Sequence, residues 1–406
     1  MRELLLGPDE AAAAIAAEVR PLAAEELAPR LCRGRVLAAD VVAAGPLPAF
    51  DSAAMDGYAV RAADARGAAA ARPVRLPKAG VLYAGDAGRE LPAGRALRVM
   101  TGAPLPSGAD AVVMQEHAGE DGAIVSVFRE PAPGDHVRRR GEDVEPGSRL
   151  LEAGRRLRAL DVALLCAQGV TRVPVVRRPL CGVLVTGDEL VGAEKAPGPG
   201  QVRDAVGPAV EAALEGWGAL AFGAGRGADE LDSLARRCAD ALARCDALLV
   251  CGGVSFGERD FTRAALERAG ARVVFAGVAV KPGKPLLFGA AGGKPVFGLP
   301  GNPVAALVCL DEFVRPAVEA LQGRRAAPPS YHMSGRLAEG YVKRAGRRQY
   351  LFCRADRDAA GFLLHPIRPQ GAHMLGMAAR ADSLAVAPME ASRLPAGTTL
   401  PFRWLK

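Results

Sequence analysis

The spacing of apolar and polar positions gives the first 176 residues a β-rich character. In residues 31–176 the apolar runs are short, and turn residues such as glycine or proline end each one. Such runs predict strands, here at residues 35–42, 96–100, 111–115, 123–128 and 170–176. Residues 8–19 begin with a proline and two acidic residues and continue in alanine, which predicts a helix ahead of these strands.

The next region, residues 177–324, alternates continuous apolar runs with helical stretches. Strands are predicted at residues 180–185, 219–223, 247–251, 272–280, 286–288 and 296–299, and helices at residues 205–217, 230–244, 261–269 and 302–321. Strands that alternate with helices predict a doubly wound α/β sheet. Such sheets bind ligands beyond the carboxyl ends of their strands, here residues 186–189, 252–260 and 299–302.

A polar segment with prolines, residues 324–329, precedes the C-terminal region. Residues 325–406 return to short apolar runs that prolines interrupt, which predicts a small all-β domain. The fold class is therefore multidomain α/β plus β, with a β-rich N-terminal region at residues 1–176.

Composition fits a globular protein, with 50% hydrophobic and 24% charged residues. The net charge of +7 suits an anionic small substrate, although an arginine-rich coding bias would also produce it. The basic residues form no dense tract with interleaved aromatic residues, so we expect no nucleic-acid partner.

The eight cysteines show no CxxC spacing, which excludes the usual zinc and redox motifs and fits buried thiols in a reducing cytoplasm. Acidic residues near the N-terminus argue against a secretory leader. No apolar run reaches the roughly 18 residues of a membrane-spanning helix. We expect a cytoplasmic protein that makes no membrane contact.

The densest chemical signal is the segment VKPGKP at residues 280–285. Lys281 and Lys284 flank a Pro-Gly turn, so both ammonium groups can converge on one phosphate or tetrahedral oxyanion. The alternative is a surface turn with two solvated lysines.

Two further loops follow predicted strands. Residues 299–303 (LPGNP) offer Pro300 and Gly301 before Asn302 as an N-cap, with open backbone amides that would bind an anion; the alternative is a plain helix cap. In the loop of residues 252–260, Gly252 and Gly253 would let the backbone approach a flat or phosphorylated ligand, and Ser255 could donate to it. A structural turn is the competing interpretation.

Acidic residues recur at the same strand ends and in the N-terminal region. Each one is most often a cap, a turn residue or a solvated acid. As a set they suit a Mg²⁺ site, since Mg²⁺ prefers oxygen ligands and substrate phosphate. The set comprises Asp56, Asp143, Asp188, Glu189, Asp229 and Asp260.

Eight segments resemble, in order and approximate spacing, the motifs of the MoeA/gephyrin family of molybdopterin molybdenumtransferases. Four lie in the N-terminal region: FDSAAMDGYA (50–59), MTGAP (100–104), GADAVV (108–113) and RRGED (139–143). The others are residues 186–190, 252–260, 281–285 and 299–304. Together they span nearly the whole chain.

The resemblance implies four domains: the N-terminal region with an inserted lobe at about residues 47–145, an α/β molybdopterin-binding domain at 177–324, and a C-terminal β-barrel at 325–406. It implies a homodimer whose active site lies between the α/β domain of one subunit and the N-terminal lobes of the other. The implied activity is insertion of molybdate into adenylylated molybdopterin with release of AMP, assisted by Mg²⁺. A molybdopterin adenylyltransferase and molybdoenzymes are expected as partners.

Functional residues of the family map onto individual positions. The implied catalytic residues are Asp56, Thr101, Asp143, Glu189, Asp229, Asp260 and Lys281, with Glu189 and Asp260 as metal ligands. The implied substrate-binding residues are Thr186, Asp188, Gly252, Gly253, Ser255, Lys284, Pro300, Gly301, Asn302 and Arg347.

The chain departs from the family pattern at Ala53, Ala305 and Ala372, where serine or another hydroxyl is usual, at Gly277, where many members have lysine, and at Val206, where asparagine is common. Each lost hydrogen bond to a charged ligand would cost roughly 1.5–3 kcal/mol. Two alternatives stay open: a paralogue that uses tungstate, another oxyanion or a nucleotide, and a non-catalytic pterin-binding scaffold.

Overall fold

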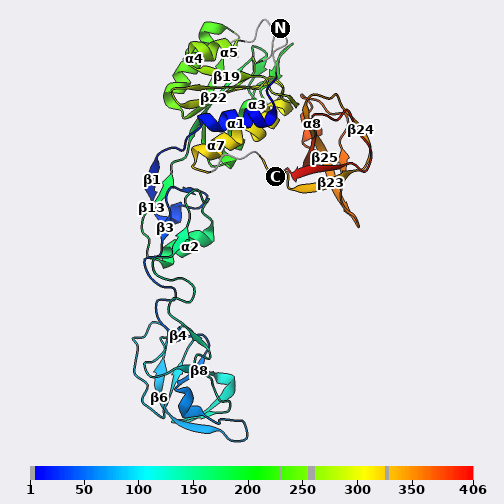
Figure 1. Ribbon diagram of the computed structural model, residues 1–406. Coiled ribbons are helices and arrows are strands. Elements are labelled where there is room, and N and C mark those ends of the chain that lie inside the picture. Colours follow the sequence, from blue (N-terminus) through cyan, green and yellow to red (C-terminus); the bar gives the residue numbers. More distant parts are fainter. Residues whose placement is uncertain (1–4, 228–229, 255–260, 325–328, 406) are drawn as a thin grey trace. The chain divides into compact units, whose positions relative to one another are not determined.

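The computed structural model describes residues 5–227, 230–254, 261–324 and 329–405 (Figure 1). The chain divides into two compact units. Unit 1 comprises residues 1–39, 153–162 and 172–406, and unit 2 comprises residues 40–152 and 163–171.

Unit 2 is built on a six-stranded sheet with a core on each face. Its strand order is β8 (Ala111–Met114), β5 (Gly57–Val60), β7 (Ala96–Val99), β6 (Val74–Leu82), β10 (Ile124–Val127) and β9 (Ala118–Asp121). Alternate residues of β5 serve the two cores, since Tyr58 and Val60 pack with one cluster and Ala59 with the other. Short turns η2 (Ala62–Ala65) and η3 (Gln115–His117) join strands of the sheet.

Two small ladders complete unit 2. Strand β4 (Ser52–Ala53) pairs antiparallel with β11 (Val137–Arg138), and β3 (Val41–Val42) pairs with β12 (Arg149–Leu151). The first ladder brings the 50–59 segment next to the 139–143 segment, although more than 80 residues separate them in the chain.

The central sheet of unit 1 follows the order β17 (Leu220–Gly227), β14 (Leu180–Thr186), β18 (Ala247–Cys251), β22 (Lys294–Leu299), β21 (Leu287–Ala291) and β19 (Arg272–Ala276). The first four strands are parallel, and β21 pairs antiparallel with both of its neighbours, β22 and β19. All five residues of β18 are buried, as expected for a strand covered on both faces.

Helices cover both faces of this sheet. In β18, Ala247 and Leu249 pack into one core and Leu248 and Val250 into the other. The first core also holds residues of α1 (Pro8–Glu18), α3 (Val206–Gly216), α6 (Pro303–Cys309) and α7 (Arg315–Leu321). The second holds residues of α4 (Leu231–Arg244) and α5 (Thr262–Arg268). The sheet is therefore doubly wound, as the sequence predicts.

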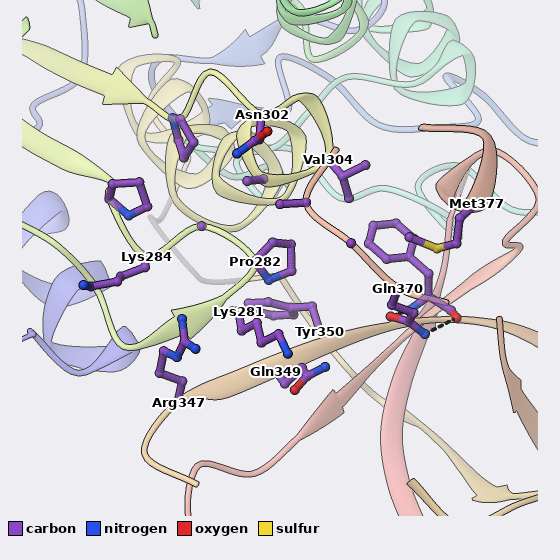
Figure 2. Close-up of a pocket in the computed structure, with 17 residues that line it drawn as sticks. Lys281, Pro282, Lys284, Asn302, Val304, Arg347, Gln349, Tyr350, Gln370 and Met377 are labelled. Atoms are coloured by element: carbon purple, nitrogen blue, oxygen red, sulfur yellow. Dashed lines mark hydrogen bonds between the residues drawn. The ribbon is translucent and has the colours of Figure 1, made fainter. Parts of the chain in front are cut away.

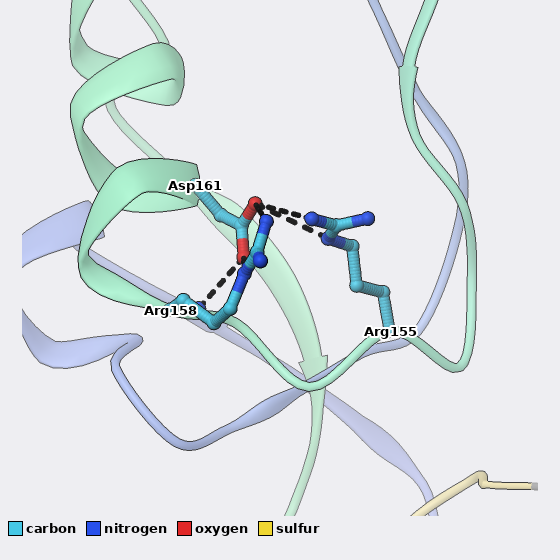
Figure 3. A network of polar contacts seen from close by, with 3 residues as sticks. All are labelled: Arg155, Arg158 and Asp161. Carbon is cyan, nitrogen blue, oxygen red and sulfur yellow. Dashed lines mark hydrogen bonds and ion pairs between the residues drawn. The ribbon is translucent and has the colours of Figure 1, made fainter.

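A small sheet near the N-terminus has the order β1 (Ala24–Leu27), β13 (Val173–Val176), β2 (Val36–Leu37), and the turn η1 (Pro29–Leu31) follows β1. Helix α2 (Ala159–Ala167) begins nearby in unit 1. Its third residue, Asp161, accepts the backbone N–H of Arg158 at 2.8 Å and a guanidinium N–H of Arg155 at 2.8 Å (Figure 3). The buried carboxylate thus satisfies an otherwise open amide at the helix start.

The C-terminal region forms a closed five-stranded barrel. The order is β25 (Arg348–Asp358), β26 (Gly361–Pro366), β23 (Met333–Leu337), β29 (Thr399–Trp404) and β27 (Ser383–Ala387), and β27 pairs again with β25. Strand β20 (Val280–Lys281) adds to β25 in parallel. The remaining elements are α8 (Leu375–Ala378) and the ladders β15 (Leu190–Val191) with β16 (Val202–Arg203) and β24 (Tyr341–Val342) with β28 (Arg393–Leu394).

The predicted fold class is confirmed, but three predicted elements differ. The strands expected at residues 35–42 and 272–280 are each two strands in different sheets, β2 with β3 and β19 with β20. The helix expected at residues 302–321 contains a π-helical turn, η4 (Leu310–Val314), between α6 and α7. The domain boundaries drawn from the sequence stay a prediction.

Candidate functional site

A cavity of about 750 Å³ lies at the carboxyl ends of the central strands of unit 1. We call it the strand-end pocket. Its lining includes seven of the predicted site residues: Thr186, Glu189, Gly252, Gly253, Pro300, Gly301 and Asn302. Three loops that are far apart in the chain therefore meet there, because parallel neighbouring strands end at the same edge of the sheet.

Gly252 shows why this loop requires glycine. Its φ is +104°, and a Cβ atom built at this position would lie 2.5 Å from the carbonyl oxygen of Thr186. The carbonyl oxygen of Gly252 accepts a hydrogen bond from the buried hydroxyl of Thr262 at 2.8 Å. The loop after β18 thus lies against the last residue of β14 and is bound to the first residue of α5, with backbone on the pocket surface.

Two carboxylates among the described residues line the strand-end pocket. Glu189 is exposed. Asp204, which the sequence reasoning did not single out, is buried and accepts the amides of Val206 and Gly207 at 3.0 and 2.9 Å. It therefore fixes the start of α3. An acidic residue directly before a predicted helix was the signal that could have identified it.

A second cavity of about 270 Å³ adjoins the first, since Pro285, Pro300 and Asn302 line both. We call it the cationic pocket. Lys281, Lys284 and Arg347 line it, and the described lining residues include no carboxylate. In Figure 2 Lys281 lies near Arg347 and Gln349, whereas Lys284 extends away from Lys281. A pocket of this charge suits an anion.

Strand pairing places the cations of this pocket. Strand β20 aligns Val280 with Arg348 and Lys281 with Gln349 of β25. The amide of Arg348 also donates to the carbonyl of Ala279 at 2.8 Å. Arg347 immediately precedes β25. The ladder therefore brings it next to the lysine loop, although it belongs to a later segment of the chain.

The start of α6 corrects one expectation. Pro303 occupies the first helical turn as predicted, but the Asn302 side chain makes no capping hydrogen bond. The amides of Val304 and Ala305 both donate to the carbonyl of Ala372, at 2.9 and 3.3 Å. The chain itself satisfies these donors, so they are not the open anion site that the sequence suggested. Asn302 instead lines both pockets.

In unit 2 the predicted residues Asp56 and Thr101 form one pair. One Asp56 oxygen accepts both the amide and the hydroxyl of Thr101, each at 2.7 Å. These hydrogen bonds hold the pKa of the Asp56 carboxyl below its ordinary value, and the bond from the hydroxyl has the larger effect. The neighbouring Gly57 has no room for a side chain, since its Cβ would lie 2.0 Å from the carbonyl oxygen of Val113.

Asp143 also lies in unit 2, where its amide donates to the carbonyl of Leu47 at 3.0 Å and its side chain is exposed. The adjoining arginine turn is held by Asp51, which accepts the Arg140 amide at 2.7 Å and the Arg139 guanidinium at 3.1 Å. The structure therefore brings two of the N-terminal motifs into direct contact.

Some predicted residues lie elsewhere. Asp188 is exposed and outside the lining of both pockets. Asp229, Ser255 and Asp260 fall outside the described residues.

Within the described ranges, no three His, Cys, Asp or Glu side chains gather as a metal-binding group. No helix in the described part of the chain is long and apolar enough to cross a bilayer.

Three family models cover most of the chain. The MoeA N-terminal region (domains I and II) matches residues 6–169. The probable molybdopterin-binding domain matches residues 182–320, and the MoeA C-terminal region (domain IV) matches residues 312–403.

Individual relatives agree with these models. The molybdopterin molybdenumtransferase of Haemophilus influenzae is 36% identical over 91% of this chain and 92% of its own length. That of Bacillus subtilis is 39% identical over 70% and 67%. The molybdopterin biosynthesis MoeA protein from Pyrococcus horikosii is similar in structure, with a TM-score of 0.84, 31% identity and 99% coverage of both chains. The chain belongs to the MoeA family of molybdopterin molybdenumtransferases.

Proposed function

We propose that this chain inserts molybdate into adenylylated molybdopterin and releases AMP and molybdenum cofactor. The observation that carries the proposal is the junction of the two pockets in unit 1, which share Pro285, Pro300 and Asn302. One pocket is large and carries backbone from a glycine loop, and the other is small and cationic. A phosphorylated pterin in the first would place its dithiolene beside an oxyanion in the second.

Each pocket contributes positioning and charge. Lys281 and Arg347 bind the tetrahedral molybdate dianion, because two cations with no carboxylate among the described lining residues favour negative charge. Gly252 and Gly253 let the ligand approach the backbone. The dithiolene sulfurs bind molybdenum while one oxo group leaves as water with the two thiol protons. A water molecule then hydrolyses the phosphoanhydride, which releases AMP and leaves the phosphate on the pterin. Most of the rate enhancement then comes from orientation and electrostatic stabilisation.

A divalent metal fits this arrangement when the substrate supplies most of its ligands. Among the described residues the strand-end pocket offers Glu189 as an exposed carboxylate, while Asp204 already accepts two amides. Mg²⁺ commonly takes one or two carboxylates together with phosphate oxygens and water. Glu189 would hold such an ion, with Asp260 as its proposed second ligand, and the ion would offset pyrophosphate charge.

The decisive experiment measures molybdate-dependent AMP release from adenylylated molybdopterin. Lys281→Ala should reduce release sharply, with tungstate compared in parallel as the competing oxyanion. Unchanged AMP release in Lys281→Ala would refute the role of this lysine. No AMP release by the unaltered protein would instead favour a pterin-binding scaffold.

The proposal includes a homodimer in which Asp56 and Thr101 of one subunit complete the pockets of the other. The exposure of both side chains supports it, since they are available to a second chain. Asp56→Ala and Lys281→Ala carry their defects in different units of the chain. Mixing the two inactive variants should therefore restore part of the activity through mixed dimers. Mixtures as inactive as either variant, with subunit exchange demonstrated, would rule out a shared site.

A further inference from the structure

Lys343 is a buried lysine with 6% of its surface exposed, and it precedes Arg347 of the cationic pocket by four residues. Its ammonium donates to three backbone carbonyls: Pro388 at 2.7 Å, Ala391 at 2.8 Å and Met389 at 3.4 Å. An ammonium group has three N–H donors, so these carbonyls use all of them. All three acceptors lie in the segment of residues 388–391, which directly follows β27.

Residues 388–391, together with the adjoining Ser392, also hold the loop that carries Arg347. The amide of Gly346 donates to the carbonyl of Met389 at 2.8 Å, and the amide of Lys343 donates to the carbonyl of Ser392 at 2.9 Å. Arg347 follows Gly346 directly and lines the cationic pocket. Removing the Lys343 ammonium would leave the part-buried carbonyls of Pro388 and Ala391 without this donor, whereas the Met389 carbonyl would keep the Gly346 amide. The Arg347 loop would be held less firmly.

Lys343 also adds charge. Burial lowers its pKa, the negative charge of Glu390 acts in the opposite direction, and the positive charges of Lys281 and Arg347 lower the pKa further. The hydrogen bonds of residues 388–391 to both the Lys343 ammonium and the Gly346 amide tie the ammonium to the loop that carries Arg347. The dipoles of three backbone carbonyls hold the ammonium. A cluster of like charges gains most when a multivalent anion binds beside it.

We propose that Lys343 is a positioning residue for oxyanion binding, which fixes the Arg347 loop at the cationic pocket and adds a further positive charge to those of the lining cations. This inference rests on the proposed function. Because the ligand is a tetrahedral dianion, Lys343 should affect its binding more than the later bond rearrangements.

The test uses the full chain with Lys343→Met, which keeps an apolar stem, and Lys343→Arg, which keeps the charge. Lys294→Met is the matched control, since Lys294 also donates to one carbonyl, that of Leu242 at 2.6 Å, but lies outside the lining of both pockets. Lys343→Met should raise the KM for molybdate about tenfold, equivalent to about 1.4 kcal/mol, with kcat within about twofold. Lys343→Arg should recover most of the affinity, and Lys294→Met should leave KM unchanged.

Direct binding of molybdate, measured by equilibrium dialysis, separates the possible failures. A folded Lys343→Met protein with unaltered KM and unaltered molybdate binding would overturn the inference and leave the proposed function intact. An unaltered protein that neither binds molybdate nor releases AMP would overturn the proposed function, and the inference with it.

Glu390→Gln provides the test if Lys343→Met does not fold. Glu390 is exposed, and its replacement removes a negative charge that acts on Lys343 without touching the carbonyl acceptors. Molybdate KM should fall about twofold at low ionic strength, and the effect should fade in salt as the charges are screened. An unchanged or higher KM would contradict a contribution of this cation cluster to oxyanion binding.

Discussion

The amide and the hydroxyl of Thr101 donate to the same carboxylate oxygen of Asp56, each over 2.7 Å. The two residues are 45 positions apart in the chain, and both belong to segments that the sequence singled out. The arrangement stabilises the charged form of an exposed carboxylate, because both donors bond to the ionised oxygen. Asp56 therefore keeps its negative charge at lower pH than an ordinary aspartate would.

Thr101→Val should raise the pKa of Asp56 toward its ordinary value, because it removes the hydroxyl donor, the largest cause of the lowered pKa. Thr101→Ser keeps a hydroxyl and is the matched control. Carbon-detected NMR titration of the Asp56 carboxyl measures the pKa directly. The acid limb of the pH–rate profile should move to higher pH in Thr101→Val only. Equal titration curves for the two variants would show that the hydroxyl contributes nothing.

Ala372→Ser should strengthen oxyanion binding. Ala372 lines the cationic pocket, and its backbone carbonyl is fixed by the Val304 and Ala305 amides. A hydroxyl on this fixed backbone would add a donor to a charged ligand, and a tenfold lower molybdate KM corresponds to about 1.4 kcal/mol. Ala53→Ser is the control, because Ala53 is wholly buried in β4 and outside the lining of this pocket. A KM that does not fall in Ala372→Ser would mean that the missing hydroxyl is compensated elsewhere.

Gly252→Ala should disrupt the strand-end pocket. The new methyl group would meet the Thr186 carbonyl oxygen at 2.5 Å, and an alanine would be strained at φ +104°. Gly270→Ala separates the two effects, since Gly270 has φ +89° but open space around its Cβ position. Thermal unfolding should show a loss of about 1 kcal/mol for Gly270→Ala and clearly more for Gly252→Ala. Equal losses would argue that the loop relaxes without a clash.

Asp161→Ala should destabilise unit 1 by about 1–3 kcal/mol, because it removes hydrogen bonds to two arginines and one helix-start amide. Burial favours a raised pKa for the Asp161 carboxyl, but the hydrogen bonds of Arg158 and Arg155 outweigh it and hold the pKa well below its usual range. The stabilisation is therefore complete above about pH 4 and declines as the pH falls further.

Urea unfolding at several pH values tests this prediction. The difference between the unaltered protein and Asp161→Ala should be constant near neutrality and shrink on acidification below about pH 4. Asp358→Ala in the barrel is a useful comparison, since Asp358 also pairs with an arginine but is exposed. A difference that grows on acidification would contradict the assigned sign of the Asp161 pKa shift.

Three of the parallel strands of the α/β sheet, β14, β18 and β22, were predictable because they are buried on both faces and therefore read as continuous apolar runs. The edge strand β17 is exposed or half-buried over most of its length, and only its first half was predicted. Strand β6 was not predicted. It contains Pro77 and Gly80, which normally end a strand, and its register with β7 shifts between Lys78 and Val81. The π-helical turn in residues 310–314 was also hidden, because its apolar pattern continues that of the flanking helices.

The candidate site was predictable where a motif follows a strand. The three strand-end loops converge because the topology dictates it, and the sequence named Thr186, Gly252 and Asn302 for that reason. The hydrogen bonds of the Val304 and Ala305 amides were not predictable, because their acceptor, the Ala372 carbonyl, lies 67 or more residues further along the chain. Lys343 was not predicted either, because its hydrogen-bond partners are distant backbone carbonyls, which no sequence motif marks.

The pairing of β20 with β25 restricts how the domains of this protein can recombine in evolution. Lys281 and Arg347 reach one cavity because two residues of the α/β region, Val280 and Lys281, form a ladder with a strand of the barrel. A fragment that ends before the barrel would lose Arg347 and leave the edge of β20 bare. Recombination between residues 281 and 347 would combine the two halves of this cavity from different parent proteins, whose side chains have not been selected together. Both halves must therefore evolve as one unit, although they belong to separately recognisable domains.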